Sequence, residues 1–114
     1  MRKQCHNPYM PLWEHVPDGE PHVFGDRLYV FGSHDLENGN EFCEQDYVCW
    51  SAPVTDLSDW RCDGVIYKKE QDPYNQDALP LYAPDVVKGP DGRYYLYYCI
   101  KFQDSINVAV CDTP

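Results

Sequence analysis

The chain has 114 residues, a length typical of one small domain or of a piece of a larger one. Its 9 basic and 19 acidic residues give a net charge of −10, which makes nucleic acids and anionic membranes poor partners. No window approaches the roughly 18–20 apolar residues of a membrane span, and the basic start lacks the apolar segment of a signal peptide. A cytoplasmic location is therefore expected.

Strand patterns recur along the chain with turn residues between them. The first unit has four expected strands in a meander, and a polar stretch separates it from a second unit of three. Frequent prolines leave little room for helices, so the fold class is predicted to be all-β. The expected strands are 20–24, 27–32, 46–51 and 63–68 in the first unit, and 83–89, 93–99 and 106–111 in the second.

The two units align as an internal repeat. Asp18 lies 67 positions before Asp85, and Arg27 lies 66 positions before Arg93. A repeat of this length that carries strands in a meander predicts β-propeller blades. We expect one domain over 1–114, with a first blade at about 17–68 and an incomplete second blade at about 82–114. The strand at 93–99 has large side chains on both faces, so we expect its sheet to be buried on both sides, as when blades stack.

Each unit opens with an aspartate at the entrance of its first strand, Asp18 in "PDGEP" and Asp85 in "APDVV". In a propeller the first strand of each blade lines the central channel, so the two carboxylates should converge on one mouth. Carboxylates in a pocket with aromatic walls suit glycoside hydrolysis. The alternative is that each aspartate only caps a turn through its own backbone.

The six cysteines show no Cys-x-x-Cys pair, and the histidines have no spacing that makes a metal site. An even count permits three disulfides, but without a secretion signal reduced and mostly buried thiols are expected. No metal site is therefore predicted. The cysteines are Cys5, Cys43, Cys49, Cys62, Cys99 and Cys111.

Four segments, in this order, resemble successive signatures of glycoside hydrolase family 43. The resemblance implies a five-bladed β-propeller that hydrolyses arabinose- or xylose-containing glycans with inversion. It also implies three carboxylic residues: an Asp that acts as general base, a Glu that acts as general acid, and a second Asp that orients this acid and raises its pKa. The segments are "VPDGEPHVFGDRLYVFGSHD", "WSAPVTDLSDWRCDGVIY", "YAPDVVKGPDGRYYLYY" and "INVAVCDTP".

The resemblance assigns catalytic roles to two residues. Asp18 matches the general base. The family often has Asp-Pro at this point, whereas this chain has Asp18-Gly19, so Glu20 is a second, less favoured candidate for the base. Asp85 matches the second Asp, which raises the pKa of the acid because a nearby negative charge disfavours ionisation. The acid Glu belongs to a later blade, and Glu70 is a poor substitute. The chain alone is therefore expected to be inactive or nearly so.

The resemblance also implies substrate contacts. His34 and Asp35, in "GSHD", fall where the family places part of its sugar pocket, and Tyr82 stands where many relatives carry a stacking Trp. The alternatives are that the first pair shapes a polar loop and that Tyr82 is buried between blades. Many family members hold calcium in the channel, but its anchoring His comes from a later blade, so no cofactor is assigned here.

The residues also allow two other functions. An unfinished propeller has exposed sheet edges, so a non-catalytic carbohydrate-binding or self-assembling module is the main alternative. A related five-bladed clan that cleaves fructosides also opens with an Asp, but "VPDGEP" fits its motif poorly. Both arabinose and xylose stay open as the sugar, and both exo and endo attack stay open as the mode of cleavage.

Overall fold

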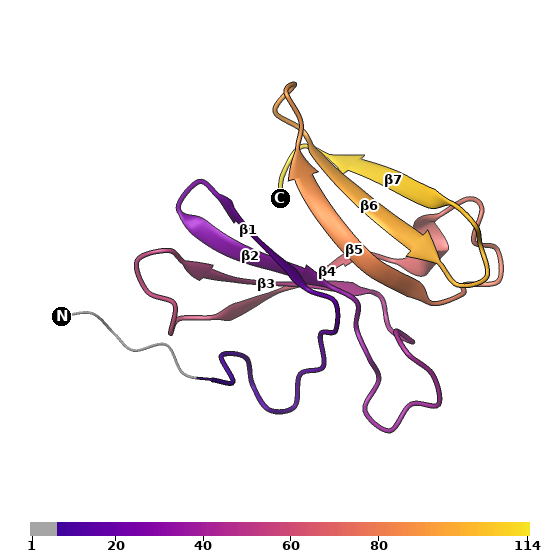
Figure 1. Cartoon of the computed structure of the whole chain (residues 1–114), viewed down its shortest axis with the longest axis horizontal. Helices are drawn as coiled ribbons and strands as arrows, with labels where there is room; N and C mark the ends of the chain where they lie inside the picture. Colours follow the sequence, from indigo (N-terminus) through magenta and orange to yellow (C-terminus); the bar gives the residue numbers. More distant parts are fainter. Residues whose placement is uncertain (1–6) are drawn as a thin grey trace.

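The computed structural model describes residues 7–114, which form two antiparallel sheets (Figure 1). The first sheet has four strands in the order β1-β2-β3-β4, and the second has three in the order β5-β6-β7. All seven predicted strands are confirmed, and residues 7–114 contain no α-helix. The elements are β1 (Glu20–Phe24), β2 (Arg27–Gly32), β3 (Tyr47–Pro53), β4 (Arg61–Tyr67), the 3₁₀ helix η1 (Lys69–Gln71), β5 (Leu81–Lys88), β6 (Tyr94–Ile100) and β7 (Ile106–Cys111).

Tight turns set the register of both sheets. β1 and β2 are joined by Gly25 and Asp26 alone, and Phe24 pairs with Arg27 across that turn. Gly25 has a φ of 63°, a left-handed conformation that glycine adopts without steric cost. The meander that the turn residues predict follows directly, because each strand pairs with the next one along the chain.

The two sheets share one apolar core. β5 lies against both β1 and β2, so the first strands of the two sheets are neighbours (Figure 1). The core side chains come from both sheets and fill the layer between them, and their burial is the main stabilising contribution. They are Phe31, Tyr47, Cys49, Leu81, Val86, Leu96, Tyr98 and Ile100.

The second sheet is buried on one face only. In β6, Leu96 and Tyr98 are buried while Tyr97 is 45% exposed. The neighbouring Val108 of β7 is 55% exposed on the same outer face, where it pairs with Tyr97. The expected burial of this sheet on both faces is therefore not seen within residues 7–114, because the outer face is an apolar surface open to solvent.

Hydroxyl groups connect the sheets within the core. Tyr47 of β3 donates its hydroxyl hydrogen to the carbonyl of Tyr82 in β5 at 2.7 Å. The hydroxyl of Tyr98 donates to buried Asp72, and it lies 2.9 Å from the hydroxyl of Tyr67 in β4. Because buried polar groups are costly without partners, these bonds fix how the sheets stack.

The expectation of mostly buried thiols holds only in part for the described residues: Cys43 and Cys49 are buried, Cys99 is half-buried, and Cys62 and Cys111 are exposed. Cys43, Cys49, Cys62, Cys99 and Cys111 are free, and Cys5 lies outside the described residues, as does His6. Trp50 is buried, and Trp60 is half-buried beside Tyr9. Within residues 7–114, no helix has the length and apolar character needed to cross a membrane.

Candidate active site

An arm that precedes β1 places Asp18 at the start of the first sheet. Val16 of this arm packs so closely on Gly32 that a Cβ atom there would lie 2.0 Å from the Val16 Cγ1 atom. Only glycine therefore allows the arm to lie at this depth. Asp18 follows with a φ of 56°, a left-handed conformation that Asp tolerates better than most residues.

The Asp18 carboxylate is exposed and free. Within residues 7–114 it has no hydrogen-bond or ion-pair partner, so the turn-capping alternative does not apply to its side chain. The charge of Asp18 reaches Cys43: burial raises the pKa of that thiol, a hydrogen bond with Ser33 lowers it, and the charges of Asp35 and Asp18 raise it. An unpartnered carboxylate keeps its lone pairs available to accept a proton from water.

A β-bulge in β5 sets the direction of Asp85. The pairing of β5 with β6 slips between Tyr82 and Asp85, and the residues between them are Ala83 and Pro84. Ala83 has a φ of 36°, and Pro84 has no N–H to give to the ladder. The Ala83 N–H donates instead to the Ser33 hydroxyl at 2.9 Å, which ties the bulge to the first sheet. Bulges commonly re-aim side chains next to active sites.

Asp85 is paired with His22, a residue for which the sequence predicts no role. The Asp85 Oδ1 atom lies 2.5 Å from Nε2 of His22, and it also accepts the N–H of Val86 at 2.8 Å. The two side chains remain partly open to solvent. The contact joins the first strands of the two sheets. Asp18 and Asp85 therefore differ: the Asp18 carboxylate has no partner among residues 7–114, whereas the Asp85 carboxylate contacts His22 and the Val86 N–H.

The predicted substrate residue His34 lies at the same junction between the sheets. It follows Ser33, whose hydroxyl bonds to the β5 bulge, and its Nε2 atom lies 2.7 Å from a carboxylate oxygen of Glu14. Glu14 was not predicted as a functional residue.

Asp35 and Tyr82 flank this junction on its two sides. The Asp35 Oδ1 atom accepts the N–H of Cys43 at 2.7 Å, and the Asp35 carbonyl accepts from the Gln45 amide. Asp35 thus holds the loop between β2 and β3, as the polar-loop alternative predicts. Tyr82 is half-buried, and its carbonyl bonds to Tyr47. The five predicted site residues lie in the segments before β1, after β2 and in β5, which the His22–Asp85 and Ser33–Ala83 contacts join.

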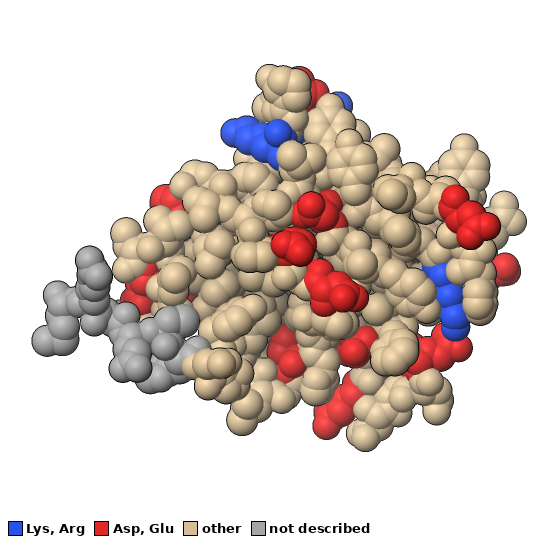
Figure 2. Space-filling view, viewed as in Figure 1, with Lys and Arg blue, Asp and Glu red and all other residues tan. Residues whose placement is uncertain are grey.

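The molecule carries an excess of negative charge. Carboxylates are numerous and cations few on the face that Figure 2 shows, in agreement with the net charge of −10. Among the described residues, no group of three or more His, Cys, Asp or Glu side chains has an arrangement that could hold a metal ion.

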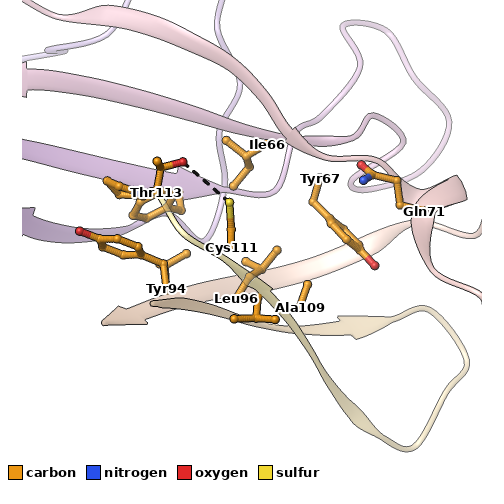
Figure 3. Close-up of a pocket in the computed structure, with 12 residues that line it drawn as sticks. Ile66, Tyr67, Gln71, Tyr94, Leu96, Ala109, Cys111 and Thr113 are labelled. Atoms are coloured by element: carbon orange, nitrogen blue, oxygen red, sulfur yellow. Dashed lines mark hydrogen bonds between the residues drawn. The ribbon is translucent and has the colours of Figure 1, made fainter. Parts of the chain in front are cut away.

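A separate cavity of about 360 Å³ lies between the sheets (Figure 3). Its wall is mainly apolar and includes Ile66, Tyr94, Leu96 and Ala109. Cys111 and Thr113 lie beside each other at its edge, 3.8 Å apart between sulfur and hydroxyl oxygen. None of the five predicted site residues lines it, so this cavity is a gap in the stacking of the sheets and distinct from the candidate site.

Two stacked antiparallel meanders whose first strands are neighbours, with a carboxylate at the entrance of each, form adjacent blades of a β-propeller. No family model matches the chain. A protein of Thermoclostridium stercorarium named "Xylosidase/arabinosidase" is 63% identical over the whole chain and 24% of its own length. One of the same name from Bacteroides ovatus is 33% identical over 93% of the chain and 35% of its length.

A solved structure of a related enzyme is also similar to most of this chain. The family 43 enzyme of Xanthomonas citri complexed with xylose is 28% identical, with a TM-score of 0.70 over 92% of this chain and 31% of that one. The chain is therefore similar to a part of glycoside hydrolase family 43 enzymes, and its two sheets match part of their five-bladed propeller. It covers about a quarter to a third of the length of these relatives.

Proposed function

We propose that this chain is the part of a glycosidase that supplies the general base, and that the full-length protein hydrolyses xylose- or arabinose-containing glycans with inversion. The observation that carries this proposal is the 63% identity, over the whole chain, to a protein named for both activities. The free Asp18 carboxylate beside the entrance of β1 supplies the chemical group that such a reaction needs.

In this mechanism Asp18 accepts a proton from a water molecule as the water attacks the anomeric carbon. The bond from that carbon to the leaving oxygen breaks, and the leaving oxygen takes a proton from an acid on the opposite face of the sugar. Inverting enzymes separate these carboxyl groups by about 6.5–9.5 Å to leave room for the water. The resemblance places the acid, a Glu, in a later blade.

Asp85 acts on that acid through its charge. His22 and the Val86 N–H hold its Oδ1 atom, which fixes the position of the carboxylate. A fixed negative charge disfavours ionisation of a neighbouring acid, so the acid stays protonated at neutral pH. His34 and Tyr82 contact the sugar from the two sides of the junction, and Asp35 supports the loop that carries His34.

The test is hydrolysis by the full-length protein of an aryl β-xyloside and an aryl α-arabinofuranoside, with the first-formed sugar observed by NMR. We expect at least one to be cleaved, and a cleaved β-xyloside to give α-xylose first. Release of β-xylose first, or cleavage of neither substrate, would contradict the proposal.

For the 114-residue chain by itself, we propose binding and self-association without turnover. The exposed apolar face of β6 and β7, with Tyr97 and Val108, favours this second role. Sedimentation of the isolated chain at several concentrations tests it, and a monomer at all of them would contradict it.

A further inference from the structure

Glu14, in the arm before β1, is a buried carboxylate with both oxygens in use. Its side chain is 4% exposed. Oε2 accepts the indole N–H of Trp50 at 2.7 Å, and Oε1 accepts the backbone N–H of His15 at 2.9 Å. Oε1 also lies 2.7 Å from Nε2 of His34. A charged side chain is rarely buried unless its partners satisfy it, and these three do so.

Several contacts hold this arrangement in place. The carbonyl of His15 accepts the N–H of Asp35 at 3.0 Å, which joins the arm to the loop that carries His34. The ring of Trp13 lies 5.9 Å from that of Trp50 between centroids. Together with the close packing of the arm on β2, these contacts fix the distance from Glu14 to His34.

The partners determine the tautomer of His34. An indole N–H can only donate a hydrogen bond, and a carboxylate can only accept. Nε2 of His34 must therefore carry a hydrogen to bond with Glu14. In the neutral ring this leaves Nδ1 as an acceptor. The His34 side chain is 19% exposed, so the ring is partly open to a ligand.

We propose that Glu14 is a positioning residue that fixes His34 in the Nε2–H tautomer, with Nδ1 as acceptor for a hydroxyl of the bound xylose or arabinose unit. The inference rests on the proposed function, because that function supplies the sugar. A neutral sugar offers hydroxyl donors, which suit a neutral imidazole acceptor.

The variant Glu14→Gln tests the tautomer directly. Gln keeps the shape but has one acceptor oxygen and one NH₂ donor. Trp50 is buried and can only donate, whereas the bond to the His15 N–H is exposed and can be replaced by water. The amide oxygen should therefore face Trp50 and its NH₂ should face His34. His34 then switches to the Nδ1–H form, and its acceptor toward the sugar becomes a donor.

Long-range nitrogen NMR of the His34 ring, at a pH where the ring is neutral, reads the tautomer. We expect Nε2–H in the wild type, Nδ1–H in Glu14→Gln, and no change in the control Glu37→Gln, which lies on an exposed loop. Nδ1–H in the wild type, or no switch in Glu14→Gln, would overturn the proposal. If Glu14→Gln does not fold, Trp50→Phe decides: it leaves the carboxylate in place, so a loss of the Nε2–H form would overturn it.

Binding of xylotriose by the full-length protein tests the contact with sugar. One hydrogen bond to a neutral group corresponds to about two- to tenfold in affinity. Glu14→Gln should weaken binding by about this factor, and Glu37→Gln should not. A switched tautomer with unchanged affinity would overturn the sugar contact. If the wild type neither binds nor cleaves these glycans, the proposed function fails, while the NMR result still decides the role of Glu14.

Discussion

Removal of the Tyr98 hydroxyl tests how the two sheets are held together. This hydroxyl donates to Oδ2 of Asp72 and contacts Tyr67, while Oδ1 of Asp72 accepts the N–H of Tyr74 at 2.7 Å. Tyr98 and Asp72 are 3% and 4% exposed. Tyr98→Phe leaves one oxygen of a buried carboxylate without its partner. A hydrogen bond to a charged group is worth about 1.5–3 kcal/mol, so the free energy of unfolding should fall by about that amount.

The pH dependence gives a second signature. Burial foremost, and then the bonds to Asp72 and Tyr67, raise the pKa of Tyr98 above its ordinary value. In the unfolded chain a tyrosine ionises near pH ~10. Stabilisation by the Tyr98 hydroxyl is therefore fully present below about pH 10 and is lost as the pH rises above it. The difference between wild type and Tyr98→Phe should shrink there.

Urea unfolding followed by tryptophan fluorescence, at neutral pH and at about pH 11, measures both effects. Tyr95→Phe is the matched control, because it also removes a β6 hydroxyl bonded to an aspartate, Asp91, at 2.6 Å, but at the surface. The reasoning is refuted if Tyr98→Phe is no more destabilised than this control. It is also refuted if Tyr98→Phe loses the same free energy of unfolding, relative to wild type, at both pH values.

Three further predictions concern the outer face, the charge and the bulge. Val108→Lys should raise the concentration needed for self-association roughly tenfold, as measured by sedimentation velocity. Unchanged association would show that the outer face of β6 and β7 is not the contact surface. In the full-length protein, Asp85→Asn should move the alkaline limb of the rate profile about one pH unit lower, and an unmoved limb would contradict its tuning role. Ser33→Ala should cost about 0.5–1.5 kcal/mol and speed amide exchange at Ala83; unchanged exchange would contradict the contact.

The strands could be predicted because their signals are local. The turn at Gly25 and Asp26 and the one at 90–92 interrupt runs of β-branched and aromatic residues, and each run became a strand. The bulge was harder to foresee. Pro84 within an expected strand indicates an irregularity, but the direction in which Asp85 then points depends on the Ser33 hydroxyl, 50 positions earlier.

The candidate site could be predicted only in part, because its contacts join distant parts of the chain. Asp18 could be placed at a strand entrance, but the lack of a partner for its carboxylate depends on the packing of the arm. His22 and Asp85 are 63 positions apart and meet only when the blades stack. Glu14 lies in an arm without periodic pattern, and its partners His34 and Trp50 are 20 and 36 positions away, so no local signal points to it.

The most direct test of the account is the turnover of Asp18→Asn in the full-length protein with an activated aryl glycoside. An activated leaving group does not need the acid but still needs the base to activate water, so the account predicts a loss of about 10²–10⁴-fold. Glu20→Gln, two residues further along the chain, should keep near-normal rates. Near-normal turnover by Asp18→Asn, or a comparable loss in Glu20→Gln alone, would contradict the assignment of Asp18 as the base.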